Sequence, residues 1–403
     1  MNKNKLFTIC DFYILSRLIY ELQAFLFGGS GSFIAQLFFL FFFGTSVYYT
    51  YYAIKRYRLP AFMKALSVLL AMFTIYGIIP ILMGEKYQIG PFFVPGYAYL
   101  QQIYLSLLPI FAFFVFFKKG LLGPERIQRW IIIFFIALII QFIQEKNKAL
   151  QLLMDTGSRS EEVTNNVGYY FLGLIPLLAF LSKKRVLQYI GLSLIMLFII
   201  LSVKRGAIVI GAVCIFWFLY NTLKNTRRSQ RAILILLSVV VVIVGVYLVH
   251  NMLENNEYFY TRLEKTIDGD TSGRDYYYTK YWNHFTKESN LLEFLFGNGA
   301  NATIKIGGNY AHNDWLEIAI NQGFMGLIIY LIYFVRFFKS SRVARFDNAT
   351  HLALSLLFII EISKTMISMS YSDLSIQSTF CLGLCMGIIS DYESSKNFQV
   401  ANC

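Results

Sequence analysis

The sequence predicts an all-α integral membrane protein: a polytopic bundle of about 12 transmembrane helices with one large extracytoplasmic loop. Three observations predict this class. Hydrophobic residues make up 57% of the 403 residues and charged residues 15%, whereas a soluble domain carries about 25% charged residues. Twelve runs are apolar enough to cross a bilayer, and the basic residues gather in every second connecting segment.

Each predicted span is a run near the roughly 20 apolar residues that a bilayer crossing needs. The first is the weakest, because Arg17 and Glu21 interrupt it. They are four residues apart and can pair on one helix face; if this segment lies at the membrane interface, eleven spans remain. The fifth run is short and is expected to extend outward. The predicted spans are 7–27, 33–53, 65–83, 99–117, 130–144, 168–182, 186–203, 206–223, 232–250, 314–335, 350–369 and 375–390.

The Lys and Arg residues predict the orientation of the bundle, since cytoplasmic loops carry an excess of both. With the N-terminus inside, 22 of the 36 fall in inner segments and 12 in outer segments. Both termini are therefore predicted to be cytoplasmic. This asymmetry explains the net charge of +13, and the sequence lacks the basic binding motif that a nucleic-acid partner would need.

The chain is predicted to form a single polytopic membrane domain, 1–403. A 62-residue outer loop, 251–312, separates the ninth and tenth spans, and a smaller outer loop covers about 145–167. We expect both to pack on the bundle. The N-terminal apolar run lacks a small-residue cleavage site, so we expect it to be retained. None of the five cysteines lies in an outer loop, which predicts no disulfide framework.

Within the large loop, Ser272-Gly273-Arg274-Asp275 fits the start of a helix over about 273–288. This helix would put Tyr278, Trp282 and Phe285 on one face. That face either packs on the membrane edge, as interfacial aromatic residues do, or stacks against sugar rings.

Three basic residues on the predicted outer face call for an explanation. Lys204-Arg205-Gly206 opens the eighth span, and interfacial snorkelling would account for its two cations. We favour an anion site, because the N–H groups and dipole of a helix start attract anions and Gly206 would let a phosphate approach the backbone. Arg274 gains nothing from the dipole at a helix start; a bound diphosphate would explain it, as would a surface arginine without a role.

His312 lies just before the tenth span, at its outer end. The positive end of a helix lowers the pKa of an imidazole and keeps it neutral, and a neutral imidazole can act as a general base. A structural histidine is the alternative. Asp373, in the last outer turn, either caps the last span or orients His312 or an acceptor. Glu361 and Lys364 can pair within the eleventh span, as a structural stitch or as a functional pair.

No cofactor and no metal site are predicted. The sequence has no Walker A pattern, so no ATP drive is visible. Asp268-Gly269-Asp270 matches a pattern that holds metals for nucleotide-sugar donors, but it faces outward by the predicted topology and is better explained as a solvated turn. Cys381 and Cys385 share a face of the last span without a His or carboxylate to complete a metal site.

Over residues 186–335 the chain resembles the O-antigen ligase and O-antigen polymerase family. The resemblance rests on Ser202-Val203-Lys204-Arg205-Gly206, on Ser272-Gly273-Arg274 and above all on His312-Asn313-Asp314-Trp315-Leu316 followed by Gly323-Phe324-Met325-Gly326-Leu327. Lys204 is a departure, since the family often has a small hydroxylated residue there.

The resemblance implies a GT-C-like, metal-independent, inverting glycosyltransferase of the bacterial inner membrane. Its donor would be a glycan on undecaprenyl diphosphate at the periplasmic face. Arg205 and Arg274 match the diphosphate-binding arginines, His312 matches the histidine that activates the acceptor hydroxyl, and Asp373 matches a carboxylate near the last spans. The further substrate-binding candidates are Lys204, Asn313, Tyr278 and Trp282.

The acceptor defines two enzymes. A polymerase extends a lipid-linked repeat unit, whereas a ligase transfers to the lipid A core, and a related branch transfers to protein. Arg262 and Gly273 fit an R-x10-G pattern of some polymerases, so polymerase is the leading prediction, with a chain-length regulator and membrane lipids as partners. The non-enzyme alternative, a flippase or transporter, usually shows paired broken helices, and the sequence has no convincing pair.

Overall fold

The computed structural model describes residues 7–27, 32–90, 92–156, 165–257, 259–261, 264, 269 and 273–401. Its helices are α1 (Ile9–Glu21), α2 (Gln23–Phe27), α3 (Phe33–Arg56), α4 (Ala61–Leu82), α5 (Tyr97–Lys118), α6 (Pro124–Thr156), α7 (Val167–Leu172), α8 (Leu174–Leu178), α9 (Arg185–Leu201), α10 (Arg205–Lys224), α11 (Arg228–Asn255), α13 (Arg274–Asn283), α14 (Leu291–Phe296), α15 (Ala302–Gly307), α16 (Asp314–Val343), α17 (Asn348–Ile367) and α18 (Ile376–Ala401). Short helical turns are η2 (Ala179–Leu181), η3 (His284–Glu288) and η4 (Ala344–Phe346), and the strands are β1 (Lys86–Ile89) and β2 (Phe92–Pro95).

The predicted polytopic helical class is confirmed. In the described part of the chain, eight helical stretches are long and apolar enough to cross a membrane: α3, α4, α5, residues 124–148 of α6, α10, α11, residues 314–346 of α16 with η4, and α17. Two shorter apolar stretches, 167–181 and 185–201, coincide with predicted spans. The first predicted span is divided into α1 and α2, and α18 does not meet the same criterion. Among the described residues, eight candidate spans are thus supported by length and composition, and the count of twelve stays a prediction.

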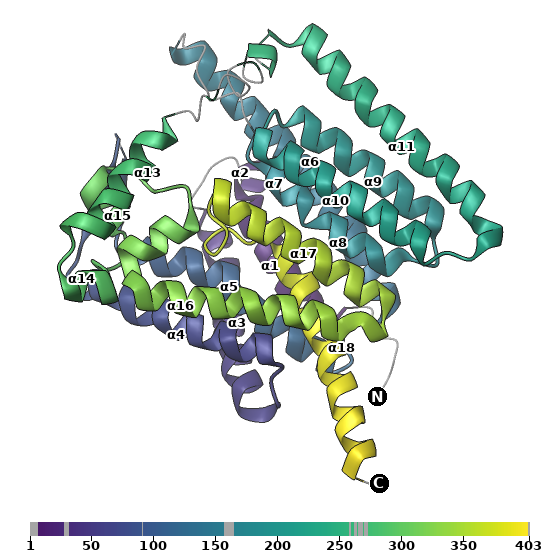
Figure 1. Cartoon of the computed structure of the whole chain (residues 1–403), viewed down its shortest axis with the longest axis horizontal. Coiled ribbons are helices and arrows are strands. Elements are labelled where there is room, and N and C mark those ends of the chain that lie inside the picture. The colour runs from purple at the N-terminus through teal and green to yellow at the C-terminus, as the bar shows by residue number, and fades with distance from the viewer. Residues whose placement is uncertain are drawn as a thin grey trace.

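Helix α5 lies at the centre of the bundle and α11 at its edge (Figure 1). Helix α5 packs against α3, α4 and α18, and its Phe111, Phe113 and Phe114 are fully buried. A helix that is apolar on all sides needs such surroundings. By contrast, Val240 and Ile243 of α11 are exposed, as expected of side chains that contact lipid.

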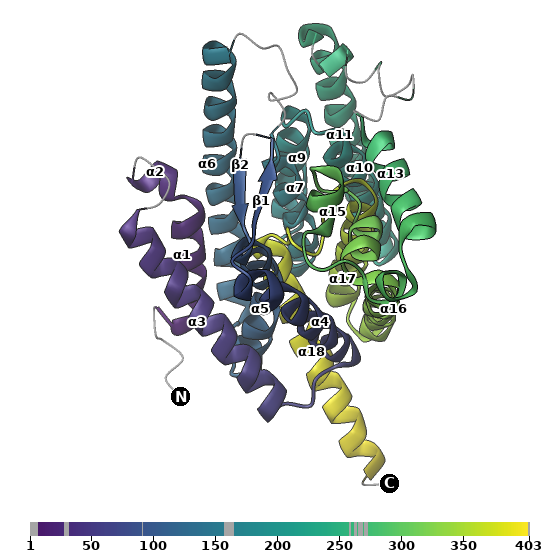
Figure 2. The ribbon, with the colours of Figure 1, turned by 90° about the vertical axis from the view of Figure 1, so that its left-hand side faces the viewer.

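A short antiparallel hairpin between α4 and α5 was not predicted, so the all-α assignment was incomplete. Strand β1 pairs with β2, with Lys86 opposite Pro95. The hairpin lies beside α15 (Figure 2). The Tyr87 hydroxyl donates to the Ala300 carbonyl at 3.3 Å, and Lys305 pairs with Glu85 at 2.8 Å. These contacts fasten the long loop 251–312 to the membrane helices.

The helix predicted at 273–288 is confirmed, since α13 and η3 together cover Arg274–Glu288. Gly273 precedes it with φ of +75°, a conformation that favours glycine. The aromatic face differs in part from the prediction: Phe285 is buried, together with Tyr281, whereas Trp282 is 56% exposed. The predicted cap Ser272, the Asp268/Asp270 pair and Arg262 lie outside the described residues.

Helix α16 is broken at Gly323, which has φ of +68°. The loop that follows α14 fills the break: the Asn298 and Gly299 amides donate to the carbonyls of Ile320 and Asn321 at 2.8 and 3.0 Å. A Cβ added at Gly323 would lie 2.5 Å from the Gly297 nitrogen. Glycine is required here by both its conformation and the close approach of another backbone segment.

Candidate active site

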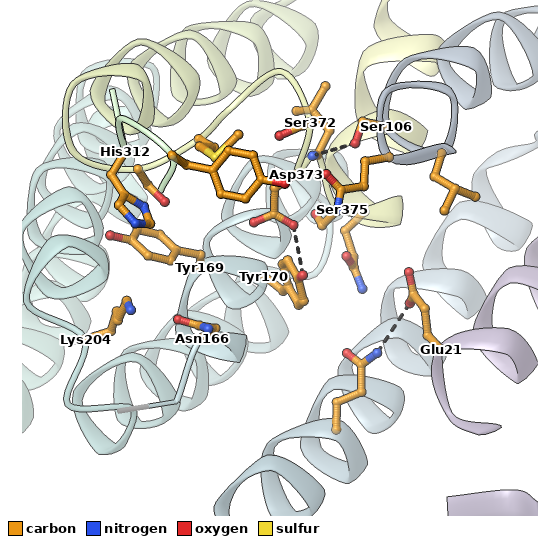
Figure 3. A pocket seen from close by; sticks show the side chains of 18 of the residues that line it. Glu21, Ser106, Asn166, Tyr169, Tyr170, Lys204, His312, Ser372, Asp373 and Ser375 are labelled. Atoms are coloured by element: carbon orange, nitrogen blue, oxygen red, sulfur yellow. Dashed lines mark hydrogen bonds between the residues drawn. The ribbon is translucent and has the colours of Figure 1, made fainter. Parts of the chain in front are cut away.

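One cavity of about 490 Å³ brings together residues from distant parts of the chain. Lys204 and His312 lie on one side of it and Glu21 on the other, with Tyr170 and Asp373 between them (Figure 3). Its lining residues are Arg17, Glu21, Gln102, Leu105, Ser106, Gln141, Asn166, Tyr169, Tyr170, Lys204, Arg274, Tyr310, His312, Ser368, Met369, Ser372, Asp373, Leu374, Ser375 and Gln377.

Four of the eight candidate residues from the sequence line this cavity: Lys204, Arg274, His312 and Asp373. Lys204 occupies the N-cap position of α10 and Arg274 the first position of α13. Arg205, Asn313, Tyr278 and Trp282 are not part of the lining. In the tight turn before Lys204, between α9 and α10, Val203 takes a left-handed φ of +55°.

Arg274 is held by the end of α17. Its Nη1 donates to the Ile367 carbonyl at 2.7 Å, and Ile367 is the last residue of that helix. The last carbonyls of a helix have no partner within it and carry the negative end of its dipole. A guanidinium has further N–H groups, so this bond orients Arg274 and leaves it able to bind an anion in the cavity.

His312 also has a left-handed backbone, with φ of +51°. Two hydrogen bonds hold the backbone at and next to His312. The Ala311 amide donates to the buried Glu317 carboxylate at 2.8 Å, and the Tyr278 hydroxyl donates to the His312 carbonyl at 3.4 Å. Left-handed conformations at non-glycine residues cost about 1–3 kcal/mol each and cluster at functional sites. Tyr278 thus contributes through the backbone of His312.

The imidazole of His312 is neutral at pH 7. Burial lowers its pKa, and the positive charges of Arg274 and Lys204 lower it further, to about 4. From the sequence, a lowered pKa is predicted for His312, but with the helix dipole as the cause of the lowering. The cause in the structure is desolvation together with two neighbouring cations. Asn313, next to His312, caps α16 by accepting from the Trp315 and Leu316 amides at 3.0 and 3.2 Å.

The turn 368–375, between α17 and α18, forms one wall of the cavity, and buried charged groups anchor it. Asp314 accepts from the Ser370 amide at 3.1 Å, and the Lys364 ammonium donates to the Asp373 carbonyl at 2.8 Å. Glu361 accepts from the Ser370 hydroxyl. Glu361 and Lys364, which were predicted to pair, each bind the turn, because the chain folds back over the end of α17. The Lys364 charge also acts on the Glu361 carboxyl.

Asp373 lies next to Tyr170 in the middle of the cavity (Figure 3). The Tyr170 hydroxyl donates to its carboxylate at 2.9 Å, and the Lys364 nitrogen lies 3.9 Å from the same carboxylate. The alternative that Asp373 caps the last helix is wrong, because the Ser375 hydroxyl accepts from the Ser378 amide at 3.2 Å in that role. Asp373 therefore presents a carboxylate to the cavity.

Gly206 permits close packing between helices. A Cβ at this position would lie 2.2 Å from the Tyr169 hydroxyl, and Tyr169 lines the cavity. Thus a tyrosine side chain of the same protein approaches the backbone where we expected a phosphate.

Sequence reasoning missed the buried acids that position the site. Asp314 and Glu317 lie in the first turn of α16 and are 0% and 1% exposed. Acids in an otherwise apolar run are functional candidates by default, and that signal could have found them. Arg17 and Glu21 were recognised as a pair, which their Nε–Oε1 distance of 2.6 Å confirms, but only as a weakness of the first span.

Comparison with protein families identifies one segment of the chain that contributes residues to this cavity. Residues 190–331 match the model of the O-antigen ligase family. The chain carries an O-antigen ligase family domain. No curated protein matches the chain at a significant level. Members of the family are membrane enzymes that transfer glycans, and the family implies lipid-linked glycan substrates.

The O-antigen ligase domain supplies only part of the cavity lining. Lys204, Arg274 and His312 fall within 190–331, as does the broken helix around Gly323. Asp373 and all lining residues from α1, α5 and α6 lie outside it. The family domain thus supplies both cations and His312, whereas Asn166 and Tyr169 on the same side, and the opposite wall, belong to the rest of the chain.

Proposed function

We propose that this protein transfers a glycan from a polyprenyl diphosphate to a sugar hydroxyl at the outer face of the bacterial inner membrane. One observation carries the proposal: inside a family domain of glycan-transferring enzymes, a neutral histidine shares a cavity with two cations. A diphosphate suits the cations, and a neutral imidazole suits the activation of a hydroxyl.

In this proposal Lys204 and Arg274 hold the diphosphate of the donor. The diphosphate gains negative charge as the bond to the sugar breaks, and cations fixed beforehand stabilise that charge without reorganising. Arg274 is already oriented by the Ile367 carbonyl. Arg205, the first residue of α10, remains in the proposal as a cation beside the helix start, where N–H groups add to the attraction for phosphate.

His312 is the proposed general base. Its imidazole nitrogen takes the proton of the acceptor hydroxyl while the hydroxyl oxygen bonds to the anomeric carbon of the donor. The bond from that carbon to the diphosphate oxygen breaks, and the polyprenyl diphosphate leaves with the electron pair. Attack from the face opposite the leaving group inverts the anomeric configuration. We propose in addition that these reaction steps require no metal.

For the acceptor we propose a lipid-linked repeat unit, which makes the protein a polymerase; transfer to the lipid A core is the second candidate, favoured by the ligase name of the family. Deletion of the gene followed by gel analysis of the surface glycan separates them. Single repeats still attached to the core would indicate a polymerase. Loss of all attachment, with long lipid-linked chains left over, would indicate a ligase.

The enzymatic proposal itself is tested by His312→Ala and Arg205→Ala. Each is expected to abolish glycan transfer while the protein accumulates normally in the membrane. His351→Ala is a matched control, because the His351 Nδ1 donates to the Ser341 carbonyl at 2.7 Å and His351 lies outside the cavity lining. Full activity of purified His312→Ala would rule out the general-base role.

A further inference from the structure

The cavity has a second end, opposite Lys204 and His312, whose chemistry differs from the cationic side. We call it the α1 end and define it by five lining side chains: Arg17, Glu21, Gln102, Gln141 and Gln377. They come from α1, α5, α6 and α18, and all lie outside residues 190–331. Three carboxamides, one carboxylate and one guanidinium form a set that donates and accepts hydrogen bonds without an excess of positive charge.

Internal contacts fix the centre of this group. The Arg17 Nε and the Glu21 Oε1 are 2.6 Å apart, and the Gln141 Nε2 donates to the other Glu21 oxygen at 3.4 Å. The Arg17 and Glu21 side chains are 13% and 19% exposed. Groups that are fixed in place before a ligand arrives bind it at a lower entropic cost.

Two buried polar atoms at the α1 end have no hydrogen-bond partner among the described residues. They are the Nη1 donor of Arg17 and the Oε1 acceptor of Gln377. A buried polar group left without a partner costs about 1–3 kcal/mol, so a ligand that reaches them is favoured. A hydroxyl both donates and accepts and can serve either atom, whereas an ionised phosphate only accepts.

Charge separates the two ends. The Arg17–Glu21 ion pair leaves the α1 end without net charge, and Asp373 lies between the two ends, whereas Lys204 and Arg274 at the other end attract a diphosphate. We infer that the α1 end is a glycan subsite, which binds the hydroxyl groups of a neutral sugar ring next to the reacting bond. This inference rests on the proposed function and deepens it. The sugar belongs either to the donor or to the acceptor, since both present the same hydroxyl chemistry.

Kinetics of the full-length protein in liposomes test the subsite. Glu21→Gln removes the charge at constant size, and Gln102→Leu replaces a side chain that is exposed in the cavity. Loss of one hydrogen bond is expected to raise one KM about tenfold, with a smaller effect on kcat. A rise in the donor KM assigns the donor sugar to the α1 end, and a rise in the acceptor KM assigns the acceptor. Both KM values within twofold of wild type in both variants would overturn the inference.

Glu254→Gln is the matched control, because Glu254 is 62% exposed near the C-terminal end of α11; it should leave both KM values unchanged.

A binding measurement tests the glycan subsite without catalysis. The probe is the repeat-unit oligosaccharide released from its lipid carrier in the source strain by mild acid. Saturation-transfer NMR should detect its binding to wild type and to Lys204→Met, with the signal reduced about tenfold in Glu21→Gln. Equal binding in wild type and Glu21→Gln would overturn the subsite, whereas failure of wild type to transfer any glycan would overturn the proposed function.

Discussion

His312 should keep glycan transfer working at acidic pH, where an ordinary histidine would be protonated. Its pKa is lowered from 6.5 to about 4, which favours the neutral imidazole by about 3 kcal/mol. At pH 5.5 only about 3% of His312 would be protonated, compared with about 90% of a histidine with the usual pKa. We therefore expect kcat/KM to stay nearly constant from pH 7.5 to 5.5. The assay is transfer by the purified protein in liposomes, because kcat/KM reports the pKa of the free enzyme.

A tenfold fall in kcat/KM between pH 7.5 and 5.5 would refute this reasoning. The acid limb of kcat should lie at a higher pH than that of kcat/KM, since a bound diphosphate offsets the charges of Lys204 and Arg274. Lys204→Met should move the acid limb of kcat/KM to higher pH, because it removes one of the cations that lower the pKa of His312. Lys287→Met, at an exposed position of η3, is the control and should leave both limbs in place.

Three further predictions concern the framework of the site. Gly323→Ala should reduce the yield of monodisperse protein and lower its Tm, because the new Cβ would lie 2.5 Å from a backbone nitrogen. Gly44→Ala is the control and should change neither, because its Cβ meets nothing within 4 Å. Equal behaviour of the two variants would contradict the account of the broken helix. Lys364→Met should destabilise the protein by about 1–3 kcal/mol, since it leaves the Asp373 carbonyl without its donor; an unchanged Tm and kcat would show that the turn does not depend on this bond. EDTA should change the transfer rate less than twofold, and strong inhibition would point back to Asp268 and a metal.

Much of the fold could be predicted because membrane helices are specified locally. Length and apolar composition suffice for a span such as α10, predicted at 206–223 and found at Arg205–Lys224. The hairpin of β1 and β2 was missed, because strands of four residues carry too little periodicity to be distinguished from a loop. The sequence alone leaves the first segment open between a span and an interfacial helix, and the structure divides it into α1 and α2.

The candidate site was predictable only as far as motifs reach. The spacing around His312 and Arg274 indicated both residues, and the structure brings both to one cavity. The motif could not show that Lys204 lines the cavity and Arg205 does not, and the turn before them holds Val203 in a left-handed conformation that a β-branched residue rarely adopts. The partners of Glu361 depend on a chain reversal after α17. Neither geometry follows from residues close in sequence.

The two walls of the cavity are encoded in separate stretches of the gene. Lys204, Arg274 and His312 fall within residues 190–331, whereas Glu21, Gln141 and Gln377 come from segments before and after it. On the proposed assignments, substitutions in the outer stretches can alter which sugar is accepted while the transfer chemistry is retained. Chimaeras that exchange α1, α6 and α18 together between relatives are then a route to new glycan specificities, and exchange of 190–331 alone would carry over the reaction with the recipient's choice of sugar.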